Sequence, residues 1–300
     1  MLHRDYFGQK SEKNMAECGV CFRHCEIKEG GIGFCGARTC VEGRVTAANY
    51  GRVTSLALDP IEKKPLNRFH PGSMILSVGS YGCNLRCPFC QNAEISWSER
   101  AMRFAKEADV FSPGELAEIA QSCRDRGNIG IAFTYNEPLT GFEFVRDTAR
   151  LVHEKGMKTV LVTNGTAELS VLEELAPHID AMNIDLKGFT DHFYTDVLKG
   201  NRKMMMDFIT RAVQLCHVEL TTLIIPGEND TVQEMEQLSG WIASLKRRDG
   251  KADGRKIPLH ITRFFPRFHM TDRGPTDISQ IRCLVEAARK NLDYVYRGNC

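Results

Sequence analysis

The sequence has no long hydrophobic run and almost no net charge. A transmembrane helix needs about 18 consecutive apolar residues, and none of the apolar runs approaches that length. The first six residues lack the apolar core of a signal peptide. The 39 Lys and Arg residues balance 38 Asp and Glu residues, so the chain offers no overall attraction for nucleic acid or an anionic membrane. These absences predict a cytoplasmic protein that binds neither nucleic acid nor membrane.

Cysteine, in contrast, is abundant. The chain contains 12 cysteines, and in a reducing compartment few of them are expected to form disulfides. Five lie within residues 18–40 and three within residues 83–90. Because clustering at short spacings is typical of metal ligands, the sequence predicts two metal sites.

The length and the hydrophobic pattern predict one α/β barrel with a smaller module before it. A barrel takes about 200 to 250 residues, and the chain has 300. From residue 74 onward, short β-branched runs alternate with segments of helical periodicity, as in βα units around a parallel sheet. We therefore expect a Cys-rich, metal-organised module over residues 1–72 and a partial (β/α)6 barrel over residues 73–300. The expected strands are 74–78, 130–135, 158–163, 181–186, 218–225 and 258–264, with a seventh at 293–296.

Two helices have clear sequence signals. Ser112 and Glu115 form a capping box, with Pro113 in the first turn, so a helix should begin there and run to about Arg126. A later helix carries one apolar face that should pack against the sheet. That face consists of Val232, Met235, Leu238, Ile242 and Leu245.

The first expected barrel strand is followed by a loop with three cysteines. Cys83, Cys87 and Cys90 have the spacing C-x3-C-x2-C, and three thiolates can hold three irons of a cubane while one iron stays open to a ligand from outside the protein. A zinc site or a ferredoxin-type cluster is the alternative, and either would need a distant fourth ligand. The loop follows the carboxyl end of a strand, which is where barrel enzymes build their active sites.

At this motif the sequence resembles the radical S-adenosylmethionine (SAM) superfamily, whose hallmark is this spacing with an aromatic residue before the last cysteine, here Phe89. Within the superfamily it is similar to the radical SAM component of the AmmeMemoRadiSam system, a group related to pyruvate formate-lyase activating enzymes. The similarity covers nearly the whole chain and includes residues 18–25, 33–36, 59–66 and 82–92.

The resemblance implies that Cys83, Cys87 and Cys90 hold a 4Fe-4S cluster and that SAM chelates its open iron. Reductive cleavage of SAM would then give methionine and a 5′-deoxyadenosyl radical, which abstracts hydrogen from an unidentified substrate. The resemblance also implies a flavodoxin or ferredoxin as electron donor, and Memo-like and Ammecr-like proteins as partners.

Polar residues at the ends of other strands are candidate SAM ligands. Glu137 follows the second strand and can accept a hydrogen bond from the ammonium group of SAM, and the alternative is that it begins a helix. Asn164 follows the third strand, where it can bind a ribose or a carboxylate or cap a turn.

On the fourth strand, alternation places Asn183, Asp185 and Lys187 on one face, which we expect to point inward. Resemblance to the activating enzymes implies that Asp185 and Lys187 lie against SAM, and a structural ion pair is the alternative. On the sixth strand, His260 and Arg263 are candidates for contact with SAM or substrate. A core histidine with satisfied hydrogen bonds explains His260 equally well.

The N-terminal cysteines predict a second site. Four of them can ligate zinc or an auxiliary iron-sulfur cluster, with Cys40 or His24 as possible substitutes, and unligated thiols are the alternative. The four are Cys18, Cys21, Cys25 and Cys35.

The function predicted from the sequence is therefore that of a radical SAM enzyme. The closest alternative is an activase that installs a glycyl radical on a partner enzyme. An iron-sulfur protein for electron transfer or metal sensing is the alternative from another class.

Overall fold

The computed structural model describes residues 15–247 and 253–300. Its main element is an eight-stranded sheet in the order β14-β13-β12-β11-β10-β9-β7-β6. All neighbouring strands from β7 to β14 pair in parallel, whereas β6 (Ser55–Pro60) pairs antiparallel to β7. The parallel strands are β7 (Met74–Gly79), β9 (Asn128–Thr134), β10 (Lys158–Thr163), β11 (Ala181–Asp185), β12 (His217–Ile224), β13 (Leu259–Arg263) and β14 (Val295–Gly298).

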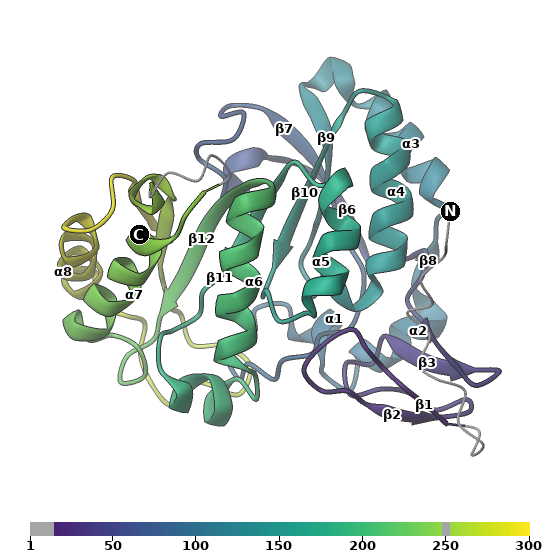
Figure 1. Ribbon diagram of the computed structural model, residues 1–300, viewed down its shortest axis with the longest axis horizontal. Helices are drawn as coiled ribbons and strands as arrows, with labels where there is room; N and C mark the ends of the chain where they lie inside the picture. The colour runs from purple at the N-terminus through teal and green to yellow at the C-terminus, as the bar shows by residue number, and fades with distance from the viewer. Residues whose placement is uncertain (1–14, 248–252) are drawn as a thin grey trace.

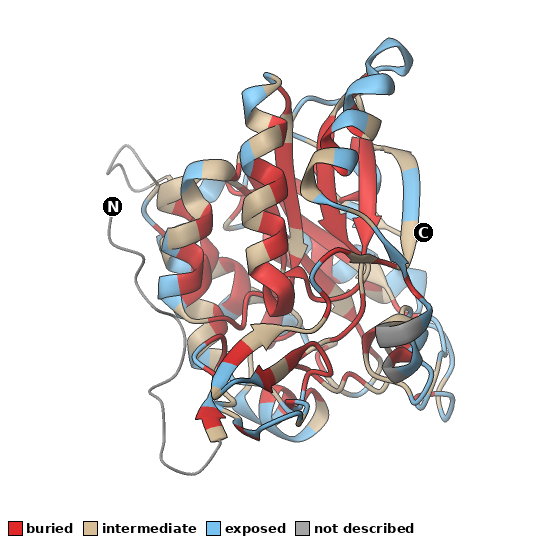
Figure 2. Cartoon of the chain, turned by 90° about the vertical axis from the view of Figure 1, so that its right-hand side faces the viewer, coloured by how far each residue is buried: buried red, intermediate tan, exposed pale blue. Residues whose placement is uncertain are grey.

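The helices connect successive parallel strands and cover one face of the sheet (Figure 1). They are α3 (Pro113–Ser122), α4 (Phe142–Glu154), α5 (Leu169–Leu175), α6 (Arg202–Leu215), α7 (Val232–Ser244) and α8 (Ile278–Arg289). The strands and the sides of the helices that face the sheet are buried (Figure 2). Because β6 and β14 end the sheet without pairing to each other, the barrel is open. This confirms the partial (β/α)6 barrel.

The two helix predictions hold in part. In α3, the Glu115 amide donates to Ser112 Oγ at 3.2 Å and the Ser112 amide donates to Glu115 Oε2 at 2.7 Å, which is the expected capping box. However, α3 ends at Ser122. A short 3-10 helix follows over Arg124–Arg126, and Gly127 ends it with a φ of 82°. Of the five apolar residues predicted to form the packed face of α7, four are buried, including Leu245 at its C-cap. Val232 is the exception at 38% exposure, because it is the first residue after the cap.

Residues 61–66, between β6 and β7, lie at the amino end of the barrel, which we call the floor. Ile61 and Leu66 are fully buried there and pack against side chains from the strands. Asn183 points inward as expected, because its Nδ2 donates to the Pro65 carbonyl at 2.8 Å and its Oδ1 accepts from Thr221 at 2.9 Å.

The N-terminal segment forms two hairpins beside the barrel. They pair β1 (Met15–Glu17) with β2 (Glu26–Lys28), and β3 (Arg38–Val41) with β4 (Arg44–Ala47). A shorter pair joins β5 (Arg52–Val53) to β8 (Asp109–Val110). The division at residue 72 stays a prediction, and hydrogen bonding crosses it, since β6 pairs with β7 along its whole length. In the described ranges, no helix has the length and apolar character to span a membrane.

Candidate active site at the carboxyl edge of the sheet

The three-cysteine loop leaves β7 at the carboxyl edge of the sheet, and we call this edge the mouth. Cys87 is buried, while Cys83 and Cys90 are half-buried. Burial raises the pKa of Cys87 to about 12 and raises that of Cys90 as well. The Leu85 amide donates to Cys83 Sγ at 3.4 Å. Three cysteine thiols within eight residues of one loop are the soft donor set that iron-sulfur clusters use.

Asp185 and Lys187 lie against these thiols. Lys187 Nζ is 2.7 Å from Asp185 Oδ2. Burial opposes the ammonium charge, but the Asp185 carboxylate and the nearby thiols of Cys87 and Cys90 outweigh it and raise the pKa of Lys187. Lys187 therefore stays cationic beside two of the proposed cluster ligands.

Two further side chains hold the backbone of Lys187 in place. Asn229 Nδ2 donates to the Lys187 carbonyl at 2.7 Å, and the Lys187 amide donates to Tyr194 Oη at 3.2 Å. Tyr194 is fully buried. The ammonium group thus projects from a fixed backbone.

Glu137 and Asn164 meet beside Cys83. The buried Glu137 carboxylate accepts from Thr163 Oγ1 at 2.7 Å, from the Asn164 amide at 2.7 Å and from the Leu139 amide at 3.0 Å. Burial raises the pKa of Glu137 to about 7 despite these bonds. The bond from Leu139 also makes Glu137 the cap of the short turn η4 (Pro138–Gly141), as the alternative interpretation expected.

Asn164 connects the third strand to the three-cysteine loop. Its Nδ2 donates to Asn84 Oδ1 at 2.9 Å and lies 3.8 Å from Cys83 Sγ. Asn84 Nδ2 in turn donates to the Thr166 carbonyl at 2.8 Å. Asn84 was not among the predicted site residues, although it stands inside the motif.

The other three predicted ligands are placed differently. Phe89 is buried and stacks parallel to Phe193, with ring centroids 6.3 Å apart. Arg263, the last residue of β13, donates from Nε to the Thr276 carbonyl at 2.7 Å. His260 lies near the amino end of the same strand and is buried.

His260 belongs to a saturated polar network at the floor. Its Nε2 is 2.7 Å from Glu219 Oε2, and its ring stacks on Tyr296. Glu219 also contacts His217 at 3.0 Å and accepts from the backbone amides of residues 67 and 68. The structure therefore matches the core-histidine interpretation, and no contact places His260 at the mouth.

The four predicted N-terminal ligands line one small cavity. They are Cys18, Cys21, Cys25 and Cys35. Burial raises the pKa of Cys35 to about 12 and of Cys21 to about 11. Cys40 lies elsewhere, with Sγ 3.8 Å from Glu29, and His24 contacts Glu17 and Glu168. Within the described residues, no group of three or more His, Cys, Asp or Glu is placed to hold a metal ion as it stands.

The N-terminal segment contacts the three-cysteine loop directly. The Cys83 amide donates to the Cys35 carbonyl at 3.0 Å. A Cβ at Gly82 would meet Ala37 Cβ at 2.7 Å, and Gly82 has a φ of 94°, so only glycine allows this approach. Arg23 Nε donates to the Asn84 carbonyl at 2.9 Å. Sequence reasoning missed Arg23, because its partner is 61 residues away.

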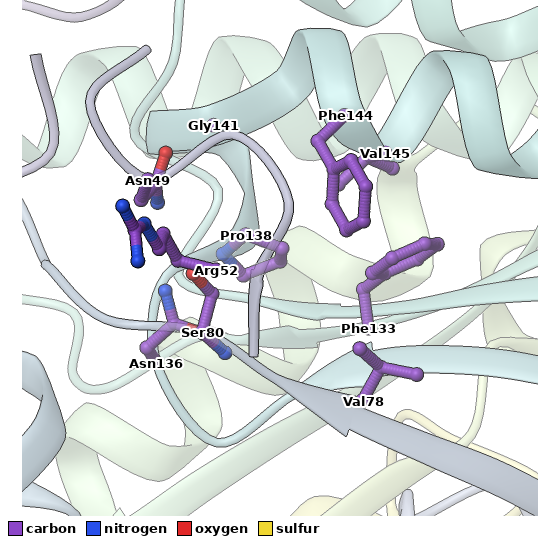
Figure 3. A pocket seen from close by; sticks show the side chains of 10 residues that line it. All are labelled: Asn49, Arg52, Val78, Ser80, Phe133, Asn136, Pro138, Gly141, Phe144 and Val145. Atoms are coloured by element: carbon purple, nitrogen blue, oxygen red, sulfur yellow. The ribbon is translucent and has the colours of Figure 1, made fainter. Parts of the chain in front are cut away.

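A small cavity lies beside the start of the loop, where Ser80 lines it (Figure 3). Its volume of about 20 Å³ is room for one water molecule. Asn49 Oδ1 and Ser80 Oγ border it and have no partner among the described residues.

The family model of the radical SAM superfamily matches residues 77–239, which include every element described at the mouth from the loop to Asn229. The chain belongs to the radical SAM superfamily. The superfamily implies a 4Fe-4S cluster and SAM as cofactors, and the thiols of Cys83, Cys87 and Cys90 fit the cluster.

Relatives of this radical SAM protein agree with that assignment. An uncharacterized protein of Methanocaldococcus jannaschii is 39% identical over 98% of this chain and 84% of its own. The pyruvate formate-lyase-activating enzyme of Clostridium pasteurianum is 26% identical over 55% of this chain and 68% of its own. The structure of Streptococcus suis SuiB bound to S-adenosylmethionine has the same fold, with a TM-score of 0.55 at 13% identity. That match covers 73% of this chain and 48% of SuiB.

Proposed function

We propose that this chain cleaves SAM reductively at a 4Fe-4S cluster held by Cys83, Cys87 and Cys90. When bound, the cluster supplies the electron that splits SAM into methionine and a 5′-deoxyadenosyl radical for hydrogen abstraction. The observation that carries the proposal is the Asp185–Lys187 pair against Cys87 and Cys90. The pair places a cation where it can attract the carboxylate of a zwitterionic ligand on the open iron.

The chain's own residues have distinct roles in this proposal. The Lys187 ammonium attracts the SAM carboxylate, and the Glu137 carboxylate accepts from the SAM ammonium. Asn164 contacts the ribose or the carboxylate from beside Cys83. Arg263 contacts SAM or the substrate from the end of β13. Phe89 supports the three-cysteine loop by stacking on Phe193.

The proposal is tested by the product of SAM cleavage. Protein reconstituted with iron and sulfide and given SAM and dithionite should form 5′-deoxyadenosine. Protein that carries the full cluster but forms none would contradict it.

We further propose that Cys18, Cys21, Cys25 and Cys35 bind a second metal centre, either zinc or an iron-sulfur cluster. The support is that all four border one cavity and that their thiols are soft donors. Metal analysis of the purified protein would distinguish the two, and replacement of Cys35 by Ala should remove that metal alone.

A second candidate function is activation of a glycyl-radical enzyme, which the similarity to the C. pasteurianum activating enzyme favours. Incubation with a candidate partner and SAM should then produce the doublet of a glycyl radical in its electron paramagnetic resonance (EPR) spectrum. The AmmeMemoRadiSam assignment predicts Memo-like and Ammecr-like partners instead, and co-purification from cells would identify them. A cytoplasmic location is part of the same proposal.

An electron-transfer or metal-sensing role is the candidate from another class. It predicts that SAM leaves the spectrum of the cluster unchanged. The gathering of Glu137, Asp185 and Lys187 around the loop argues against it, because these charged groups suit a zwitterionic ligand such as SAM.

A further inference from the structure

An exposed aromatic ring stands between two arginines on the outer side of the three-cysteine loop. The ring is that of Phe34, which is 40% exposed. The guanidinium carbons of Arg23 and Arg86 lie 3.4 and 3.7 Å from its centroid. Two guanidinium groups cannot share one ring face at that distance, so they stack on opposite faces. We call Arg23, Phe34 and Arg86 the stacked face.

Both guanidinium groups are held in place by backbone carbonyls. Arg23 donates to the carbonyls of Asn84 and Lys199, and Arg86 donates to those of Cys83, Leu85 and Phe34. No carboxylate of the described residues forms an ion pair with either arginine. The stacked face is therefore held in place, and no carboxylate of the described residues offsets its two positive charges.

The stacked face is linked to the proposed cluster ligands through the chain and through one backbone hydrogen bond. Arg86 stands in the chain between Cys83 and Cys87, and its charge interacts with both thiols. Phe34 precedes Cys35, whose carbonyl accepts from the Cys83 amide at 3.0 Å. A short path through one residue and one hydrogen bond thus connects the exposed ring to a cluster ligand.

We propose that the stacked face is the docking surface for an anionic protein that delivers single electrons to the cluster. The proposal rests on the proposed function, since reductive cleavage of SAM consumes one electron per turnover. The partner's reduced flavin or iron-sulfur centre loses that electron, and the C5′–S bond of SAM takes it up as it breaks.

The composition of the stacked face suits such a partner. Arginine and large aromatic side chains are enriched at the energetic centres of protein interfaces. Arginine keeps its positive charge and attracts the carboxylates of an anionic partner. The net charge of the whole chain is only +1, so recognition of an acidic partner has to come from a local feature of this kind.

The test compares a protein donor with a small dye. Reconstituted wild type and a Phe34→Asp variant are supplied with reduced flavodoxin, with reduced ferredoxin or with reduced methyl viologen, a small cation that needs no anion-binding surface. The rate of 5′-deoxyadenosine formation is measured against donor concentration and salt. Tyr50→Asp, at a ring 42% exposed in the same N-terminal segment, is the matched control.

We expect Phe34→Asp to weaken the apparent affinity for the protein donor by roughly tenfold or more, with the viologen-driven rate and the cluster absorbance unchanged. Salt should weaken the wild-type reaction with flavodoxin or ferredoxin but not the reaction with viologen. An unchanged rate with the protein donors would overturn the inference, and so would an equal loss with every donor. Wild type that accepts electrons from viologen but from neither protein would also contradict it. A wild type inactive even with viologen would instead refute the proposed function.

Discussion

The mouth and the floor of this barrel both bury charged side chains, but they satisfy them differently. At the floor, Glu219 has two histidines and two backbone amides as partners. At the mouth, the thiols of Cys83, Cys87 and Cys90 have few hydrogen-bond partners, and the half-buried Lys187 lies near two of them. A saturated network stabilises the fold, whereas an unsaturated one leaves capacity for a ligand. The comparison therefore predicts that changes at the mouth affect SAM chemistry and that changes at the floor affect stability.

The largest effect is expected for Cys87→Ala. Loss of one of three ligands should abolish SAM cleavage and remove the absorbance of the barrel cluster, while the unfolding temperature of the metal-free protein changes little. Cys283→Ala is the control, because that thiol is exposed on α8. A variant that still forms 5′-deoxyadenosine would show that Cys87 is not a ligand.

Lys187→Met should weaken SAM binding by roughly 10- to 100-fold, because a charge-assisted hydrogen bond is lost. Isothermal titration of SAM into the reconstituted protein measures the change. Lys203→Met, at an exposed lysine that pairs with Asp207, is the matched control. If Lys187→Met lowers stability but leaves SAM affinity intact, the pair has only a structural role.

At the floor, Glu219→Gln should lower stability in a pH-dependent way. Burial raises the pKa of Glu219, but the hydrogen bonds from two histidines and two amides outweigh it and lower the pKa to about 2. Since the folded pKa lies below the unfolded value, this stabilisation is complete above about pH 4.5 and is lost as the pH falls toward 2. The free energy of unfolding of the variant should be about 3 kcal/mol lower than that of wild type at neutral pH, as measured by urea unfolding.

The difference in the free energy of unfolding between wild type and Glu219→Gln should therefore become smaller as the pH is lowered from 7 to 3. SAM affinity of the variant at neutral pH should equal that of wild type. A changed affinity would mean that the floor and the mouth are coupled.

The sequence predicted the mouth better than the floor. Parallel strands place their carboxyl ends at one edge, and alternation is enough to bring Asp185 and Lys187 to the same side. The sequence leaves His260 open between a SAM or substrate contact and a core position, and its place near the amino end of β13 turns it toward Glu219. Residue type and strand do not determine height along the barrel, which depends on the stagger between strands.

Contacts between residues far apart in the chain could not be predicted from the sequence either. The cysteine spacing indicated that the N-terminal thiols gather, and they do line one cavity. Nothing in the spacing indicated that Cys35 would bond to Cys83, or that Arg23 and Arg86 would enclose Phe34. Such contacts follow from how the hairpins pack on the barrel, and no local pattern encodes that packing.

The most direct test of the account is the response of the reduced barrel cluster to SAM. The EPR spectrum of a Cys35→Ala variant, which should lack the N-terminal metal, isolates the cluster at Cys83, Cys87 and Cys90. We predict that SAM changes this spectrum, because the fourth iron is open to its amino and carboxylate groups. A spectrum that stays the same at saturating SAM would show that the cluster has no open position and would contradict the account.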